Sequence, residues 1–285
     1  MADRARVGAV VDGRVVDLAP ALRDPLAEGG PPDMLSLLRA GDRGLAAVAA
    51  HVARVDRDAS HPRLADVDLL APVPRPGKIV AIGRNYADHA AETGVKPFEA
   101  PRIIAKLPSS VAPPGSVVPR PEGVAKIDYE VELAVVIGTS ARRIARADAI
   151  ATVAGYTILD DVSAREFQFD VAPPQTTFAK SMDGFCPMGP WLVTRDEIPD
   201  PQALRLRTWV NDELVQDGNT RDMIVDVAGL IAYIARYMTL EPGDVIATGT
   251  PAGVGAFRKP PRYLPPGARV RLEISGIGVL EHGIG

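Results

Sequence analysis

The sequence is poor in cysteine, in basic charge and in long apolar runs, and each shortage excludes a class of protein. Cys186 is the single cysteine among 285 residues, so the chain cannot form an internal disulfide and suits a reducing compartment. No apolar run approaches the roughly 18 residues of a membrane-spanning helix, and no apolar core of signal-peptide length follows the N-terminus. We therefore expect a cytoplasmic protein that does not enter a membrane.

Basic residues do not outnumber acidic ones. Lys and Arg number 32 against 36 Asp and Glu, which gives a net charge of −4, and no basic run occurs. Because nucleic-acid-binding surfaces are usually basic, we expect no nucleic-acid partner. Glycine and proline are by contrast abundant, at 26 and 27 residues, which indicates many turns and a mainly β fold.

A proline-rich linker at residues 72–77 divides the chain into two predicted domains, 1–72 and 73–285. The first is a small α/β domain with a hairpin that turns at Asp12-Gly13, followed by helices over 34–39 and 45–55. No chemically active side chains cluster there. The candidate functional residues all lie in the second, mainly β domain.

The predicted strand over residues 127–138 carries the most informative pattern. Side chains alternate along a strand, so Glu130 and Glu132 point to the same face. Two carboxylates this close raise each other's pKa unless a cation lies between them, and a hard divalent cation prefers oxygen ligands. Glu-x-Glu is also typical of an ordinary solvated strand end. This pattern alone therefore does not distinguish a cation site from a solvated strand end.

Other charged residues follow predicted strands. Asp160 and Asp161 end a strand over 151–159, where either could complete a cation site or simply cap the next turn. Lys106 ends a strand over 102–106 and suits either an anionic substrate or the protein surface. Lys180 is predicted at a further strand end.

A short helix is predicted after residue 85, and it places His89 and Glu92 three residues apart on one face. A carboxylate orients a histidine and makes it more basic, as a general base requires, although surface pairs of this spacing are common. Further along, the glycine-rich segment 248–255 follows a strand and offers backbone N–H groups to an anion. It lacks the Walker A and dinucleotide-binding patterns. His282 is expected at the surface.

Taken in order, these segments resemble the fumarylacetoacetate hydrolase family. The resemblance covers the chain from residue 78 to the C-terminus, and Glu166 departs mildly from it where Asp is frequent. The matching stretches are 83–89 (GRNYADH), 128–133 (DYEVEL), 161–165 (DVSAR), 179–181 (AKS) and 248–255 (TGTPAGVG).

The resemblance implies a mixed β/α, mainly β fold: a β-roll C-terminal domain that many bacterial members combine with a small α/β N-terminal domain, usually as a homodimer. It implies Mg²⁺ or Mn²⁺ held by Glu130, Glu132 and Asp161, with the DVSAR motif selecting Asp161 over Asp160. It also implies catalytic roles for Lys180 and for His89 with Glu92 as a water-activating pair. The candidate substrate-binding residues are Arg84, Lys106, Tyr129, Arg165, Gln168 and Thr250.

The activity that the resemblance implies is hydrolysis of a C–C bond in a small 1,3-diketo acid through a metal-bound enolate. Acylpyruvates, fumarylpyruvate and 2,4-diketo-3-deoxy sugar acids are substrates of this type. The alternatives are a 2-hydroxyhepta-2,4-diene-1,7-dioate or hydroxymuconate-type isomerase, an oxaloacetate decarboxylase, and a non-enzymatic metabolite-binding protein that keeps the site as a relic. The His89–Glu92 pair favours water activation, and hence hydrolysis.

Overall fold

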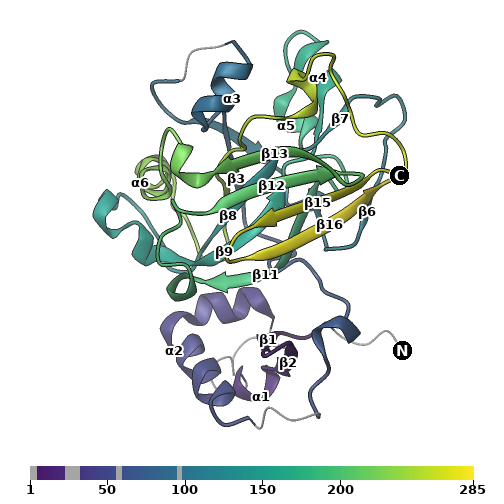
Figure 1. Cartoon of the computed structure of the whole chain (residues 1–285). Coiled ribbons are helices and arrows are strands. Elements are labelled where there is room, and N and C mark those ends of the chain that lie inside the picture. Colours follow the sequence, from purple (N-terminus) through teal and green to yellow (C-terminus); the bar gives the residue numbers. More distant parts are fainter. Residues whose placement is uncertain (1–4, 23–32, 56–59, 95–97) are drawn as a thin grey trace. The chain divides into compact units, whose positions relative to one another are not determined.

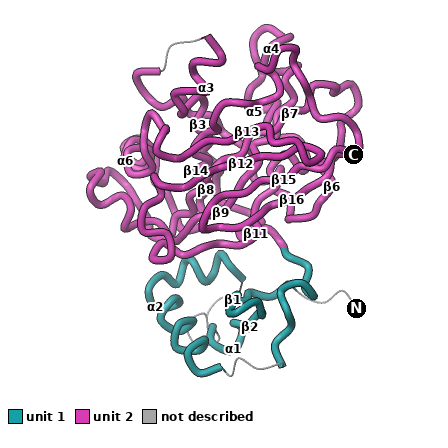
Figure 2. The backbone as a smooth tube through the Cα atoms, in the orientation of Figure 1, with its two compact units in different colours: residues 1–69 teal, residues 70–285 magenta. Residues whose placement is uncertain are grey.

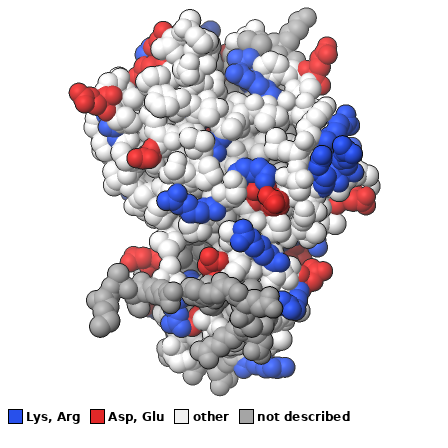
Figure 3. Space-filling view, turned by 180° about the vertical axis from the view of Figure 1, so that it is seen from behind, with Lys and Arg blue, Asp and Glu red and all other residues white. Residues whose placement is uncertain are grey.

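The computed structural model describes residues 5–22, 33–55, 60–94 and 98–285. It separates into two compact units, residues 1–69 and residues 70–285 (Figure 2). None of the described helices combines the length and apolar character that crossing a membrane requires. On the face shown in Figure 3, basic and acidic side chains are scattered over a largely uncharged surface, apart from one compact basic group at its right edge.

Unit 1 is a hairpin with two α-helices and one 3-10 turn: β1 (Gly8–Val11), β2 (Arg14–Asp17), α1 (Ala19–Leu22), α2 (Met34–Val52) and η1 (Leu64–Asp66). The hairpin turns where predicted, with Asp12 and Gly13 at φ values of 50° and 75°. A two-residue type I′ turn requires this left-handed backbone at both positions. The helices predicted over 34–39 and 45–55 form the single element α2, which bends at Gly41 (φ 56°).

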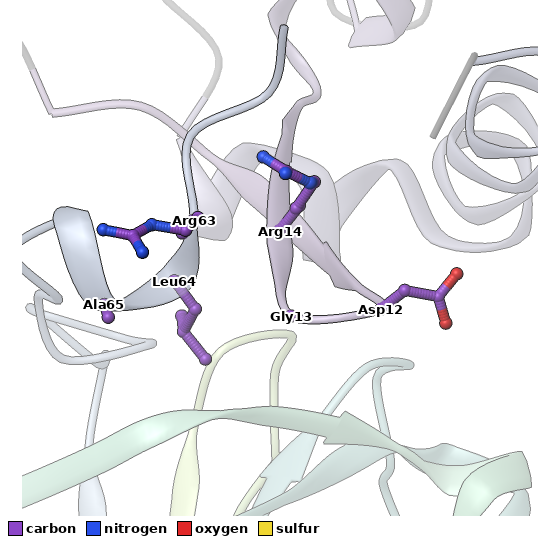
Figure 4. A pocket seen from close by; sticks show the side chains of 6 residues that line it. All are labelled: Asp12, Gly13, Arg14, Arg63, Leu64 and Ala65. Atoms are coloured by element: carbon purple, nitrogen blue, oxygen red, sulfur yellow. The ribbon is translucent and has the colours of Figure 1, made fainter. Parts of the chain in front are cut away.

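Unit 1 also carries a surface hollow of about 520 Å³, lined by Asp12, Gly13, Arg14, Arg63, Leu64 and Ala65 (Figure 4). Its two arginines have partners within the unit. Arg14 donates to the His61 carbonyl (2.7 Å), and Arg63 donates to both carboxylate oxygens of Asp66 (2.7 Å each). We therefore assign no function to this hollow.

Unit 2 is built from two large sheets (Figure 1). In spatial order the seven-stranded sheet is β4 (Arg102–Lys106), β3 (Ile79–Gly83), β14 (Val245–Ala247), β8 (Val131–Ile137), β9 (Val153–Asp160), β11 (Cys186–Thr194) and β5 (Val111–Ala112). The five-stranded sheet is β13 (Glu213–Asn219), β12 (Arg205–Val210), β15 (Arg269–Ile274), β16 (Gly278–Ile284) and β6 (Val117–Val118). A separate pair joins β7 (Ile127–Asp128) to β10 (Ser163–Ala164).

The helices of unit 2 are short apart from α6. The α-helices are α3 (Ala87–Glu92), α4 (Arg165–Phe169), α5 (Thr176–Ala179) and α6 (Val227–Tyr237). The 3-10 turns are η2 (Pro108–Ser110), η3 (Arg146–Asp148), η4 (Ile150–Thr152), η5 (Arg195–Glu197), η6 (Thr220–Asp222) and η7 (Gly255–Phe257). Strands thus dominate the unit, which confirms the mainly β fold class.

The core of unit 2 lies between the two sheets, where β12 packs on β8 and β15 packs on β9. Every residue of β8 is buried, and its odd-numbered side chains from Val131 to Ile137 belong to the main apolar cluster. Helix α6, capped by Asp226, adds Val227, Leu230, Ile231 and Ile234 to the same cluster. The strand that carries the candidate carboxylates is therefore held rigidly from both faces.

Two predicted elements differ from the structure. The strand over 127–138 is broken at residues 129–130, because the backbone N–H of Glu130 donates to the Asp160 side chain (2.8 Å) and leaves the strand pairing. Lys180 does not follow a strand. It follows the one-turn helix α5, whose four residues are too few to show a helical period in the sequence.

His282 was expected at the surface by its position near the C-terminus, and this prediction is wrong. It lies on β16 with a fully buried side chain, and its Nε2 is 2.7 Å from Oδ2 of the equally buried Asp160. The other oxygen of Asp160 accepts the Glu130 N–H. The pair therefore connects the C-terminal strand to the backbone beside the carboxylate cluster.

Replacing His282 by leucine is expected to lower the free energy of unfolding by about 2–4 kcal/mol, because a buried carboxylate loses its partner. Urea unfolding followed by circular dichroism measures this change. The control is His61→Leu, since the His61 side chain is half-buried and has no hydrogen bond within the described residues. It should shift stability by no more than about 0.5 kcal/mol. Equal stability of the two variants would contradict the structural role of His282.

Candidate active site

Three carboxylates from two neighbouring strands meet in unit 2. The carboxylate oxygens of Glu130, Glu132 and Asp161 lie within 4.8 Å of one another, and all three residues are buried. Glu132 is on β8, Glu130 lies just before it, and Asp161 directly follows β9. The pairing of β8 with β9 fixes this arrangement, since the Asp161 N–H donates to the Glu130 carbonyl (3.0 Å). Glu130 and Glu132 point to the same site, as strand alternation predicts.

Two buried lysines contact this carboxylate cluster. Lys180 Nζ lies 2.9 Å from Glu130 Oε2, 2.6 Å from Asp161 Oδ2 and 2.9 Å from the Ser163 hydroxyl. These three contacts use all three donors of the ammonium group. Lys106 Nζ is 2.8 Å from the other oxygen of Asp161 and also contacts the Lys180 carbonyl. Asp161 is therefore bridged by two cations.

The surrounding groups shift the pKa values of Glu130 and Glu132 in opposite directions. Burial raises the pKa of Glu130, but the charges of Lys180 and Arg165 outweigh it and lower that pKa to about 2. Burial also raises the pKa of Glu132, and the neighbouring charges of Asp161 and Glu130 raise it further, well above its usual value. The surrounding side chains therefore do not balance a negative charge on Glu132, and its ionised form is disfavoured.

This donor set fits a divalent cation. Three buried carboxylates with converging oxygens are the ligands that Mg²⁺ and Mn²⁺ prefer, and three protein ligands leave positions for substrate or water. A cation would also relieve the repulsion that raises the pKa of Glu132. Glu130, Glu132 and Asp161 are the residues that could hold it.

His89 and Glu92 form the predicted pair on α3. His89 Nδ1 lies 2.6 Å from Glu92 Oε1, and the second oxygen of Glu92 accepts the Gly253 N–H (3.0 Å). The imidazole is buried and packs edge-on against the Phe257 ring, with centroids 5.9 Å apart. Within the described residues Nε2 has no hydrogen-bond partner, so it is the nitrogen left to exchange a proton.

The glycine-rich segment 248–255 donates several of its backbone N–H groups to carboxylates of the protein itself. Gly249 donates to Glu132 (2.8 Å) and Gly253 donates to Glu92 (3.0 Å). The same pattern continues from Ala252 to Asp88 and from Gly255 and Ala256 to Asp128. Gly249 and Gly253 have φ values of 99° and 106°, which other residues rarely adopt. The segment thus orients Glu132 in the carboxylate cluster and Glu92 beside His89.

A cavity of about 230 Å³ opens beside these groups. Its lining includes nine of the predicted site residues: Arg84, His89, Glu130, Glu132, Asp161, Arg165, Gln168, Lys180 and Thr250. The other lining residues are Ile82, Gly83, Arg102, Ile104, Phe169, Pro174, Thr176 and Phe257. The cavity therefore brings the carboxylate cluster and the His89 imidazole to one space.

Two predicted substrate-binding residues do not line this cavity. Lys106 was open to either a substrate or a surface role, and the structure supports neither, because its ammonium group is buried behind Asp161. Tyr129 is also buried, and its hydroxyl donates to the Gly253 carbonyl (3.0 Å). Both side chains support the site from behind. Glu92 likewise does not line the cavity and contacts His89 Nδ1 instead.

Several supporting residues were not identified from the sequence. Asp128 pairs with Arg165 (2.9 Å), which in turn donates to Gln168 (2.8 Å). Gln216 on β13 donates to the Thr250 hydroxyl (2.8 Å). The aspartate stands next to the Glu-x-Glu pattern and could have been considered. Gln216 lies in an ordinary hairpin and gave no signal.

Comparisons with known proteins find relatives over most of this chain. A family model described as fumarylacetoacetate (FAA) hydrolase C-terminal matches residues 78–284. The mitochondrial oxaloacetate tautomerase of Homo sapiens is 44% identical over 252 residues, which cover 88% of this chain and 79% of that protein.

Two solved structures are similar over nearly their whole length. The fumarylacetoacetate hydrolase of psychrophilic Exiguobacterium antarcticum has 37% identity and a TM-score of 0.83, covering 100% of this chain and 96% of that one. The maleylpyruvate hydrolase of Sphingobium sp. SYK-6, in complex with manganese (II) ion and pyruvate, has 33% identity and a TM-score of 0.79. That match covers 99% of this chain and 96% of the hydrolase. These matches confirm the resemblance inferred from the five motifs, and this chain belongs to the fumarylacetoacetate hydrolase family.

Proposed function

We propose that this protein is a divalent-metal-dependent hydrolase that cleaves a C–C bond in a small 1,3-diketo acid of the acylpyruvate type. The observation that carries this proposal is one cavity lined by both the carboxylate cluster and the His89 imidazole. The complex of a similar maleylpyruvate hydrolase with manganese (II) and pyruvate supports the metal and the product type. We further propose, from the family resemblance, a homodimer that acts in the cytoplasm.

The residues around the cavity suit an enolate leaving group. Mg²⁺ or Mn²⁺ at Glu130, Glu132 and Asp161 would supply a Lewis acid that polarises the substrate carbonyls and offsets the charge of the enolate. Lys180 adds a fixed positive charge beside that position. Because its three donors already bind Glu130, Asp161 and Ser163, it acts through its charge rather than through a further hydrogen bond.

His89 is the proposed base. Nε2 takes a proton from water, whose oxygen attacks the C4 carbonyl of the substrate. The C3–C4 bond then breaks, its electron pair forms the enolate of pyruvate, and the imidazolium returns the proton to C3. Glu92 stabilises the imidazolium through Nδ1, at 2.6 Å. The products are pyruvate and a carboxylic acid, so atoms and charge balance.

A second candidate is keto–enol tautomerisation of oxaloacetate, which the name of the relative at 44% identity favours. It would use His89 to move a proton between carbon and oxygen of the substrate without any attack by water. The isomerase, decarboxylase and metabolite-binding alternatives use the same cavity. Assays that detect C–C cleavage therefore separate the main proposal from the others.

The testing experiment is a substrate panel of acetylpyruvate, fumarylpyruvate, a 2,4-diketo-3-deoxy sugar acid and oxaloacetate, each with Mg²⁺, with Mn²⁺ and with EDTA. We expect metal-dependent loss of enol absorbance together with release of pyruvate from at least one diketo acid. EDTA should lower the rate by at least about 10³-fold, since metal-assisted charge stabilisation is worth several kcal/mol. Enol loss from oxaloacetate alone, without pyruvate release from any diketo acid, would overturn hydrolysis in favour of tautomerisation.

A further inference from the structure

Gln216 is a buried polar residue that the proposed reaction does not use. It lies on β13 opposite Thr208 of β12, is only 1% exposed and is not among the residues that line the cavity. Its Oε1 accepts from the Val131 N–H (3.1 Å) and from the Thr208 hydroxyl (2.9 Å). Its Nε2 donates to the Thr250 hydroxyl oxygen (2.8 Å) and to the Pro251 carbonyl (2.9 Å). Every hydrogen-bonding position of the amide is therefore occupied, which holds it rigidly.

The neighbours of Gln216 determine which end of its amide is the oxygen. The Val131 N–H can only donate, so it faces the amide oxygen, and the Pro251 carbonyl can only accept, so it faces the amide nitrogen. A flipped amide would bring two donors together at Val131 and two acceptors together at Pro251. The nitrogen consequently also faces Thr250, and its N–H occupies a lone pair of the Thr250 oxygen.

This contact leaves the proton of the Thr250 hydroxyl available to another acceptor. Within the described residues, the bond from Gln216 is the one hydrogen bond that this hydroxyl forms. Thr250 is also one of the residues that line the cavity. The hydroxyl can therefore donate its proton to an acceptor atom of a ligand bound there.

Gln216 also fixes the Thr250 hydroxyl relative to the carboxylate cluster. Val131, whose N–H donates to Gln216, stands between the two glutamates of that cluster in the sequence. One amide thus contacts both the backbone of the carboxylate-bearing strand and the hydroxyl at the cavity wall. A donor held in this way needs no reorganisation when a ligand binds.

Close packing keeps β13 and the segment 250–253 together. A Cβ atom added at Gly218 would lie 2.4 Å from Cβ of Pro251, and one added at Gly253 would lie 2.2 Å from the Val215 carbonyl oxygen. Only residues without a side chain allow so close an approach. Gln216 lies between Val215 and Gly218 on the strand, so the approach occurs around the amide itself.

We propose that Gln216 is a positioning residue that determines ligand specificity, because it fixes the Thr250 hydroxyl as a hydrogen-bond donor toward the cavity. The cavity accordingly selects a ligand with an unprotonated oxygen at this position, as in a carboxylate or an enolate, over an amide of the same shape. The assignment of this oxygen to the head of a metal-bound 2-oxo acid rests on the proposed function. The direction of the hydroxyl depends only on Gln216 and Thr250.

Oxalate and oxamate test this polarity without turnover. They have the same shape, but oxamate carries an amide N–H₂ group where oxalate has a carboxylate oxygen. Thr250→Val removes the hydroxyl and keeps the shape of the side chain. In calorimetric titrations of the Mn²⁺-loaded protein, it should lower oxalate affinity about 10- to 100-fold, because a hydrogen bond to a charged group is lost. Unchanged oxalate affinity in this variant would overturn the proposal.

Gln216→Glu reverses the polarity and keeps both accepting contacts of the side chain, to Val131 and Thr208. The carboxylate oxygen that replaces the amide nitrogen accepts the Thr250 proton, so the hydroxyl presents a lone pair to the cavity. We expect oxalate affinity to fall by about tenfold or more beyond the effect of the added charge. The preference for oxalate over oxamate should fall with it, since the amide of oxamate can donate to that lone pair.

A double-mutant cycle separates the reversed polarity from the added charge. The charge of Gln216→Glu acts on oxalate whether or not position 250 has a hydroxyl, so the loss of affinity is measured with threonine and with valine there. We expect the loss to be about tenfold larger with threonine. A purely structural role of Gln216 predicts equal losses, and that result would overturn the proposal.

A second variant keeps the test open if thermal midpoints show that Gln216→Glu does not fold. Gln216→Met removes the donor without adding charge, and in the same cycle it should show a coupling of the same sign, at least about threefold. The outcomes are independent of the proposed reaction, because neither ligand is cleaved. The expected coupling supports the role of Gln216 even if no diketo acid reacts, and equal losses overturn it even if acetylpyruvate is hydrolysed.

Discussion

Replacing Glu132 by glutamine is expected to abolish binding of the divalent cation and to lower kcat/KM by at least about 10³-fold. The size of this effect follows from the loss of several kcal/mol of charge stabilisation when a Lewis acid is removed. Glutamine keeps the shape of the side chain, and its amide oxygen can still accept the Gly249 N–H that Glu132 accepts at 2.8 Å. The variant therefore removes a charge with little change in packing.

The same variant is expected to be more stable than the unmodified protein when no metal is present. Burial and the charges of Asp161 and Glu130 raise the pKa of Glu132, so folding disfavours its ionised form. At neutral pH the unfolded chain ionises this carboxyl freely, and that difference lowers the stability of the folded state. A neutral glutamine does not have this disadvantage. The melting temperature in EDTA should accordingly rise.

Three measurements test this pair of effects. Mn²⁺ titration followed by electron paramagnetic resonance measures binding, a coupled pyruvate assay measures rate, and differential scanning calorimetry in EDTA measures stability. Glu122→Gln is the control, because Glu122 is exposed and loses the same charge. It should leave all three quantities unchanged. If Glu132→Gln retained Mn²⁺ binding and a near-normal rate, the assignment of the carboxylate cluster as a metal site would be wrong.

Local sequence patterns predicted those features whose cause is itself local. The turn at Asp12-Gly13 and the shared face of Glu130 and Glu132 follow from backbone preference and strand alternation, and the structure contains both. The contact between His89 and Glu92 follows in the same way from helical spacing. Five motifs in one order then identified the family, which individual motifs could not do.

Features that depend on contacts between distant segments were beyond such patterns. Lys106 looks the same in sequence whether it faces solvent or Asp161, and 55 positions separate the two residues. His282 and Asp160 are 122 positions apart, so their pairing appears only when β16 and β9 pack together. The N–H groups of the glycine-rich segment could be recognised as anion-binding, but their partners belong to segments more than 100 residues earlier.

Replacing His89 by asparagine is expected to lower kcat by about 10²–10⁴-fold, the usual contribution of a general base. Binding of Mn²⁺ and oxalate should persist, because His89 is outside the carboxylate cluster. Glu92→Gln should have a smaller effect with a changed pH profile. The carboxylate of Glu92 accepts from Gly253 and contacts His89 Nδ1, and one amide cannot accept through both of its polar atoms. Glu92 is thus a positioning residue.

Exchange of the C3 hydrogens of pyruvate in D₂O, followed by NMR, shows which proton His89 transfers. This partial reaction requires enolate formation but no attack by water. If His89 both activates water and returns the proton to C3, His89→Asn should lose hydrolysis and exchange together, whereas His61→Asn, a change in unit 1, should lose neither. Loss of hydrolysis with normal exchange would restrict His89 to water and assign the C3 proton to another group. Normal hydrolysis by His89→Asn would show that His89 is not the base. The argument that favours hydrolysis over the other reactions of this cavity would then fail, because it rests on that role of His89.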